Sequence, residues 1–75
     1  MEKVKGFLKS LRRMRRAKDL TQIELGTLVG MSGHQISNLE KGINKPTLEG
    51  AFALAEALGT TVDAMVKEGL SDAEQ

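Results

Sequence analysis

The sequence predicts a compact all-α domain of five short helices. Apolar residues recur along the 75-residue chain at helical spacing, and no segment alternates as a strand would. Glycine, proline and capping Ser or Thr residues divide the chain into helical segments of about 6–12 residues each. The chain has no cysteine, so its stability cannot depend on a disulfide or a thiolate metal site.

The first helix is predicted over residues 7–18. Its apolar stripe contains Phe7, Leu8, Leu11 and Met14. A second stripe is basic and contains Lys9, Arg12, Arg13 and Arg16. Residues 1–6 are expected to form a flexible basic N-terminus before this helix.

Residues 21–42 predict two short helices joined by a tight corner. Thr21 with Glu24 and Ser32 with Gln35 have the spacing of capping boxes, so helices are expected over about 22–29 and 33–41. Gly30 between them fits a left-handed helix end, and Gly42 ends the second helix. Inward positions are Leu25, Val29, Ile36 and Leu39. Such a pair is typical of a helix-turn-helix, whose second helix enters a DNA groove.

Two further helices are predicted after the loop 43–46. Pro46 disfavours helix at Lys45, so the next helix is expected to start after Thr47 and to cover 48–58. Its predicted apolar face contains Leu48, Ala51, Phe52, Ala55 and Leu58, and Gly59 closes it. Thr60 or Thr61 caps a last short helix over about 62–66. Residues 67–75 are expected to be an acidic, fraying C-terminal tail, which leaves 7–66 as the folded domain.

Charge is divided unevenly, although the formal net charge is only +1. Residues 1–18 contain eight basic residues and one acid, a net charge of +7, whereas residues 19–75 contain three lysines and nine acids, a net charge of −6. The basic end indicates a surface for a polyanion, and a merely solubilising helix is the alternative.

The chain resembles the Cro/C1-type (XRE) helix-turn-helix family, which includes the lambdoid phage repressors. The resemblance spans residues 11–65. The matching residues are Leu11, Met14, Arg15, Leu20, Thr21, Gln22, Leu25, Gly30, Ser32, Ile36, Leu39, Glu40, Lys41, Gly42, Pro46, Thr47, Leu48, Leu54, Ala55, Leu58, Gly59 and Met65. It implies a lambda-repressor-like DNA-binding fold without a cofactor.

Four residues depart from the family pattern. Gly26 stands where the family usually has alanine, at a position that packs against the second helix of the motif and needs a small residue. Gly33 stands where the family often has a base-reading side chain. Ile23 and Leu28 occupy positions that the family tends to keep polar, so a small exposed apolar patch is expected there.

The resemblance implies roles for individual residues. Phosphate contacts should supply most of the affinity, and groove contacts the specificity. Gln22 and the free N–H groups at its helix start would hold a phosphate. His34 and Asn38 would read bases, because imidazole can donate to guanine and a carboxamide can pair with adenine.

The remaining DNA-binding candidates are placed around these residues. Ser37 and Lys41 flank the reading positions, Asn44 and Lys45 follow in the loop, and one or two of Arg12, Arg13 and Arg16 would reach phosphates. The full set of candidates is Thr21, Gln22, Ser32, Gly33, His34, Ser37, Asn38, Lys41, Asn44, Lys45, Arg12, Arg13 and Arg16. The family also implies a partly buried structural ion pair between Arg15 and Glu40.

The sequence therefore predicts a sequence-specific regulator of transcription, a repressor that binds double-stranded DNA as a homodimer on a palindromic operator. The expected dimer surface contains Val62, Met65, Val66 and Leu70, which could instead complete the monomer core. A DNA-binding antitoxin and a restriction–modification control protein remain alternatives. So do a protein-interaction module that docks through residues 22–29 and a basic arm that binds RNA or an anionic membrane.

Catalysis is not expected, because one histidine and no cysteine offer neither a catalytic triad nor a metal site. No small-molecule ligand is expected. No apolar run reaches the roughly 18 residues of a membrane span, and no signal-peptide pattern is present, so a cytoplasmic location is expected.

Overall fold

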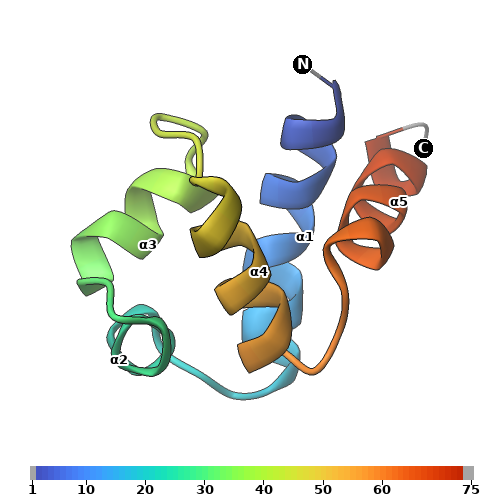
Figure 1. Ribbon diagram of the computed structural model, residues 1–75. Coiled ribbons are helices and arrows are strands. Elements are labelled where there is room, and N and C mark those ends of the chain that lie inside the picture. The colour runs from blue at the N-terminus through green and yellow to red at the C-terminus, as the bar shows by residue number, and fades with distance from the viewer. Residues whose placement is uncertain (1, 74–75) are drawn as a thin grey trace.

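The computed structural model describes residues 2–73 and contains five helices over that range. They are α1 (Glu2–Ala17), α2 (Gln22–Val29), α3 (Gly33–Glu40), α4 (Leu48–Ala57) and α5 (Val62–Ala73). The expected all-α architecture of five helices is confirmed. Figure 1 shows α1 and α5 side by side, with α2 and α3 on the opposite side of the molecule from α5.

The core takes one fully buried large apolar side chain from each helix. These side chains are Leu11, Leu25, Ile36, Leu54 and Met65. Every helix is therefore fixed to the same centre, which a small domain needs because its buried apolar area is limited. Met65 cannot belong to a dimer surface as expected, because it completes the monomer core.

The predicted apolar face of α4 is partly wrong. Ala51, Ala55 and Leu58 are buried, but Leu48 and Phe52 are 75% and 60% exposed, and Leu54 takes the central position instead. α4 packs between α2 and α5, so the stripe that runs through Leu54 faces both neighbours. Leu48 and Phe52 lie outside that stripe and are left on the surface.

The terminal helices are longer than the sequence indicated. Residues 2–6, expected to be a flexible N-terminus, are the start of α1, and residues 67–73 of the expected acidic tail continue α5. The physical reason is that these two segments pack against each other. Residue 1 and residues 74–75 lie outside the described part of the chain.

Two glycines allow α1 and α5 to cross in close contact. A Cβ atom on Gly69 would overlap the backbone of Gly6, and one on Gly6 would lie 2.7 Å from the carbonyl oxygen of Val66. The buried Ser10 hydroxyl lies 3.0 Å from the Gly6 carbonyl oxygen and also bonds the Met65 carbonyl. At positions 6 and 69 a side chain would overlap the backbone of the facing helix, so glycine fits there.

No helix within residues 2–73 is long and apolar enough to cross a bilayer.

The helix crossing gives a first prediction. Gly69→Ala gains helix propensity of about 1 kcal/mol, but it forces the two backbones apart, and overpacking costs about 1–3 kcal/mol. We expect a lower free energy of unfolding in urea. Ser71→Ala, on the exposed side of the same helix, is the control. A Gly69→Ala variant that is more stable than the wild type would contradict the close crossing.

Candidate nucleic-acid interface

Both helices of the expected motif begin with complete capping boxes. The Thr21 hydroxyl accepts from the Glu24 amide at 3.0 Å, and the Glu24 carboxylate accepts from the Thr21 amide at 2.8 Å. Ser32 and Gln35 repeat this arrangement at 3.0 and 2.8 Å. The predicted starts of α2 and α3 are confirmed, and the side chains of both N-caps have structural partners.

The corner between α2 and α3 depends on two glycines. Gly30 adopts the predicted left-handed conformation with φ of 72°, and both its amide and that of Met31 donate to the Gly26 carbonyl. A Cβ on Gly26 would overlap the carbonyl oxygen of Met31. The turn thus lies so close to α2 that glycine, rather than the family's alanine, fits at this position.

Two of the other three departures from the family pattern, Ile23 and Gly33, lie next to each other in space. Ile23 is 71% exposed and Leu28 is 61% exposed, as the sequence predicted. A Cβ on Gly33 would lie 2.8 Å from Cγ1 of Ile23 and 3.4 Å from its Cα. Ile23 therefore occupies the space beside the first residue of α3.

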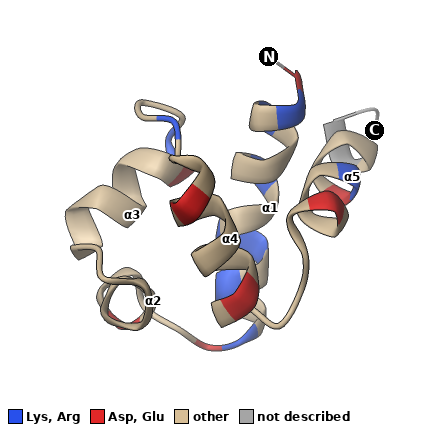
Figure 2. Cartoon of the chain, viewed as in Figure 1, with Lys and Arg blue, Asp and Glu red and all other residues tan. Residues whose placement is uncertain are grey.

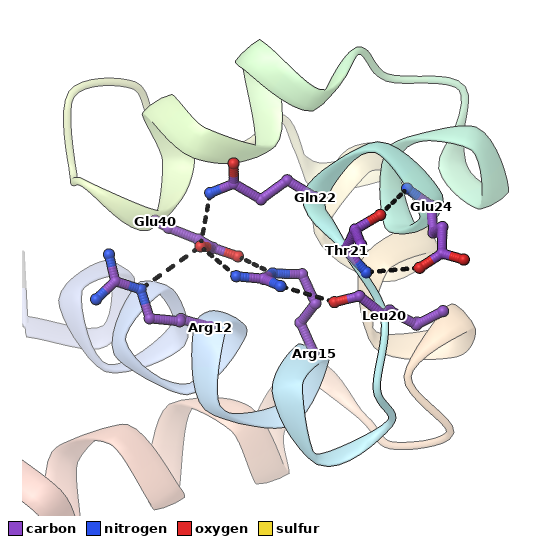
Figure 3. Close-up of polar contacts among 7 residues, drawn as sticks. All are labelled: Arg12, Arg15, Leu20, Thr21, Gln22, Glu24 and Glu40. Carbon is purple, nitrogen blue, oxygen red and sulfur yellow. Dashed lines mark hydrogen bonds and ion pairs between the residues drawn. The ribbon is translucent and has the colours of Figure 1, made fainter.

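A buried carboxylate holds the motif against α1 (Figure 3). The Glu40 side chain is fully buried and binds Arg15 through two hydrogen bonds, Nε to Oε2 at 2.6 Å and Nη2 to Oε1 at 3.1 Å. Arg15 Nη1 also donates to the carbonyl of Leu20 at 2.7 Å. The expected structural ion pair is present, and it joins α1, the end of α3 and the connection into α2.

The same carboxylate draws two predicted phosphate ligands together. Gln22 Nε2 donates to Glu40 Oε1 at 3.1 Å, and Arg12 Nε lies 3.6 Å from that oxygen. The Arg12 side chain remains half exposed. The N-terminus of α2 and a partly exposed guanidinium therefore lie at one place, an arrangement suited to a phosphate.

The three arginines proposed as additional phosphate ligands differ in their neighbours. Arg12 and Arg16 are four residues apart and lie on one side of α1, and Arg16 is exposed. Arg13 lies three residues before Arg16, on the flank of the same side, where its Nη1 is 3.5 Å from the Glu68 carboxylate of α5. Because Arg13 is paired with an acid of α5, Arg12 and Arg16 are better suited to contact DNA phosphates.

The outer side of α3 brings the predicted reading residues together. His34 is exposed, and its Nε2 lies 3.3 Å from Nδ2 of Asn38 one turn later. Ser37 is half-buried, while Lys41, Asn44 and Lys45 are exposed. The Asn38 carbonyl accepts from the Ile43 amide at 2.9 Å, which ties the loop to α3. Figure 2 shows α2 and α3 with few charges, whereas α1 and the loop after α3 carry Lys and Arg.

The surroundings of Glu40 shift its pKa. Burial alone would raise the pKa of this carboxyl, but hydrogen bonds from Arg15 and Gln22 and the positive charges of Arg15 and Arg12 outweigh burial and lower it below 4.5. The hydrogen bond to Glu40 in turn raises the pKa of Arg15, against the effect of its burial. Both groups are charged at neutral pH.

Metal binding finds no support in the part of the chain that the structure describes. No group of three or more His, Cys, Asp or Glu residues there could hold a metal ion.

Comparisons with known proteins identify the same helix-turn-helix motif. A family model described as Helix-turn-helix, HTH_3, matches residues 11–65. An uncharacterized HTH-type transcriptional regulator, y4dJ of Sinorhizobium fredii, is 43% identical over 49 residues. That match covers 65% of this chain and 64% of y4dJ, so the chain spans a little under two thirds of its relative.

Solved structures share the fold. The P22 c2 repressor, crystallised with synthetic operator 9T, is 31% identical with a TM-score of 0.77 over 83% of this chain and 94% of its own. The restriction–modification controller protein C.AhdI of Aeromonas hydrophila is 29% identical with a TM-score of 0.76 over the same shares. HppE, crystallised with FeII and substrate, is 25% identical with a TM-score of 0.75, but only 36% of that chain is covered.

Glu40 with Arg12, Arg15 and Gln22, here called the Glu40 cluster, gives a prediction about pH. Because the pKa of Glu40 is lowered in the folded state, its contribution to stability is complete above pH 4.5 and is lost as the pH falls through the lowered pKa. Glu40→Gln should therefore cost about 3 kcal/mol at pH 7, and the difference from wild type should shrink in acid. Urea unfolding from pH 7 to pH 2.5 measures this, with the exposed Glu56→Gln as control.

A substitution of Arg15, the partner of Glu40, can contradict the role given to this ion pair. If Arg15→Met is as stable as the wild type at pH 7, the cluster does not hold the motif.

Proposed function

Since the chain belongs to the Helix-turn-helix family, we propose that it binds double-stranded DNA sequence-specifically and regulates transcription. The observation that carries this proposal is the α2–α3 corner, in which two capping boxes, the Gly30 turn and the Glu40 cluster hold α3 with His34 and Asn38 on its outer side. The P22 c2 repressor, a structural relative, was crystallised with synthetic operator 9T.

In the proposed complex α3 lies in the major groove. His34 and Asn38 contact base edges, with Ser37 beside them. The phosphate contacts come from Gln22 at the start of α2, from Arg12 and Arg16 on α1, and from Lys41, Asn44 and Lys45 after α3. Thr21 and Ser32 contribute mainly as caps, which present free backbone amides at the two helix starts.

Repression is the regulatory role we propose, in line with the P22 c2 repressor. A control function in restriction and modification is the second candidate, because C.AhdI shares the fold at a similar identity. We propose a cytoplasmic, non-enzymatic protein, since its suggested ligand is DNA and the site consists of capped helix ends, amides and basic side chains. HppE shows that the fold also forms part of a chain crystallised with a substrate.

We propose in addition that a second copy covers the face formed by α4, α5 and the start of α1. Leu48 and Phe52 are the exposed apolar residues of α4. They border two neighbouring grooves of about 350 and 440 Å³, both of which are also lined by Val62 and Val66. Of the four residues expected at the dimer surface, Val62 and Val66 line both grooves, Leu70 lines neither, and Met65 is buried in the monomer core. A two-fold dimer would match a palindromic operator.

Base reading and phosphate binding are separable by mutation. On an operator selected from random DNA, Asn38→Ala should lose preference at one base pair, worth about 1–3 kcal/mol. Lys45→Ala should weaken binding to all DNA sequences alike, and it should reduce the slope of log affinity against log salt concentration by about one. Fluorescence anisotropy on matched and single-substitution duplexes measures both. Equal loss on every duplex for Asn38→Ala would remove it from the reading residues.

Dimerisation is tested with two exposed apolar residues. Phe52→Ser should raise the dimer dissociation constant about tenfold or more while the unfolding midpoint stays near that of the wild type, because Phe52 lies outside the monomer core. Leu28→Ser, on α2 and equally exposed, should leave association unchanged. A wild-type protein that sediments as a monomer at high concentration, with and without DNA, would contradict the dimer.

A further inference from the structure

We propose that Ile23, a residue of α2, recognises the C5-methyl group of a thymine in the operator, and so takes over the reading position that Gly33 leaves empty on α3. The inference rests on the DNA binding proposed above. It adds a specificity-determining residue that lies outside the recognition helix.

The first observation is steric. Gly33 opens α3 at the end that the proposed complex directs at DNA, and it has no side chain to contact a base. A Cβ placed there would lie 2.8 Å from Cγ1 of Ile23. The Ile23 side chain therefore fills the space beside this position, which a longer residue at 33 would otherwise use.

The second observation is exposure combined with rigidity. Ile23 is 71% exposed, although it is a large apolar residue in the first turn of the capped helix α2. A β-branched side chain in a helix is largely restricted to one χ1 rotamer, so its methyl groups are held in place before any ligand arrives. Contact with an apolar group would remove this surface from water at little entropic cost.

The chemistry of the major groove restricts what Ile23 can recognise there. Among the groups that base pairs present in that groove, the thymine methyl is the apolar one, while the others are hydrogen-bond donors and acceptors. An isoleucine makes no hydrogen bonds. Discrimination should therefore depend on the methyl itself, so deoxyuridine should be bound less well than thymidine at one position.

Leu28 provides a matched control on the same helix. It is 61% exposed and similar in size, but it lies at the far end of α2, in a shallow groove shared with Ala53, Glu56 and Ala57. Truncation of Leu28 removes a comparable apolar surface without changing the neighbourhood of Gly33.

The steric part can be tested without DNA. Gly33→Gln alone should lower the thermal unfolding midpoint, because Ile23 must move. Combined with Ile23→Ala, the same substitution should be tolerated, so the two effects should be non-additive. Additive effects would overturn the contact on which the inference depends.

The decisive experiment replaces each thymidine of a selected operator, one at a time, by deoxyuridine. Wild-type affinity should fall about fourfold at one position of each half-site, the value of one buried methyl group. Ile23→Ala should bind the two duplexes equally at that position, and Leu28→Ala should keep the wild-type ratio. If Ile23→Ala keeps the wild-type ratio at every position, or weakens all duplexes alike, the inference is overturned while DNA binding stands. If no operator can be selected, the proposed function fails as well.

Discussion

The position of α3 depends on the buried carboxylate of Glu40. It accepts two hydrogen bonds from Arg15 of α1 and one from Gln22 at the start of α2, and Arg12 lies beside it. A buried carboxylate without these donors would lower the stability of the fold, so the cluster of four side chains forms only when α1, α2 and α3 are correctly packed. The cluster thereby fixes the orientation of α3, the helix proposed to enter DNA, relative to α1.

Close backbone approach is the second constraint on this small domain. Gly69 lies against the backbone of Gly6 where α5 crosses α1, and Gly26 lies against the turn that follows α2. At each place a side chain would overlap the neighbouring backbone. Gly33 differs, because the atom nearest to an added Cβ is Cγ1 of the Ile23 side chain at 2.8 Å, with the Cα and N of Ile23 at 3.4 Å. Gly33 is therefore the glycine whose nearest contact a substitution at position 23 would remove, and the one that we propose bears on recognition.

Elements whose sequence signals lie within a few residues of one another could be predicted from the sequence. The bounds of α2 and α3 follow from capping boxes and the Gly30 turn, all of which involve residues within a few positions of each other. Features that depend on packing between segments far apart in the sequence could not be predicted. The choice of Leu54 over Phe52 as the buried residue of α4, the extension of α1 and α5, and the pairing of Arg13 with Glu68 are set by neighbouring helices. The contact between Ile23 and Gly33 cannot be predicted from the sequence for the same reason, although both residues depart from the family pattern.

α1 and the Glu40 cluster hold the motif, basic side chains and helix starts are proposed to face phosphates, and α3, which carries few charges in Figure 2, is proposed to read bases. All of these proposed roles depend on sequence-specific binding to duplex DNA. Selection of bound duplexes from a random pool at physiological salt measures that binding. We expect enrichment of a two-fold motif with half-sites about one helical turn apart. Binding that is abolished by salt and enriches no sequence would contradict this expectation.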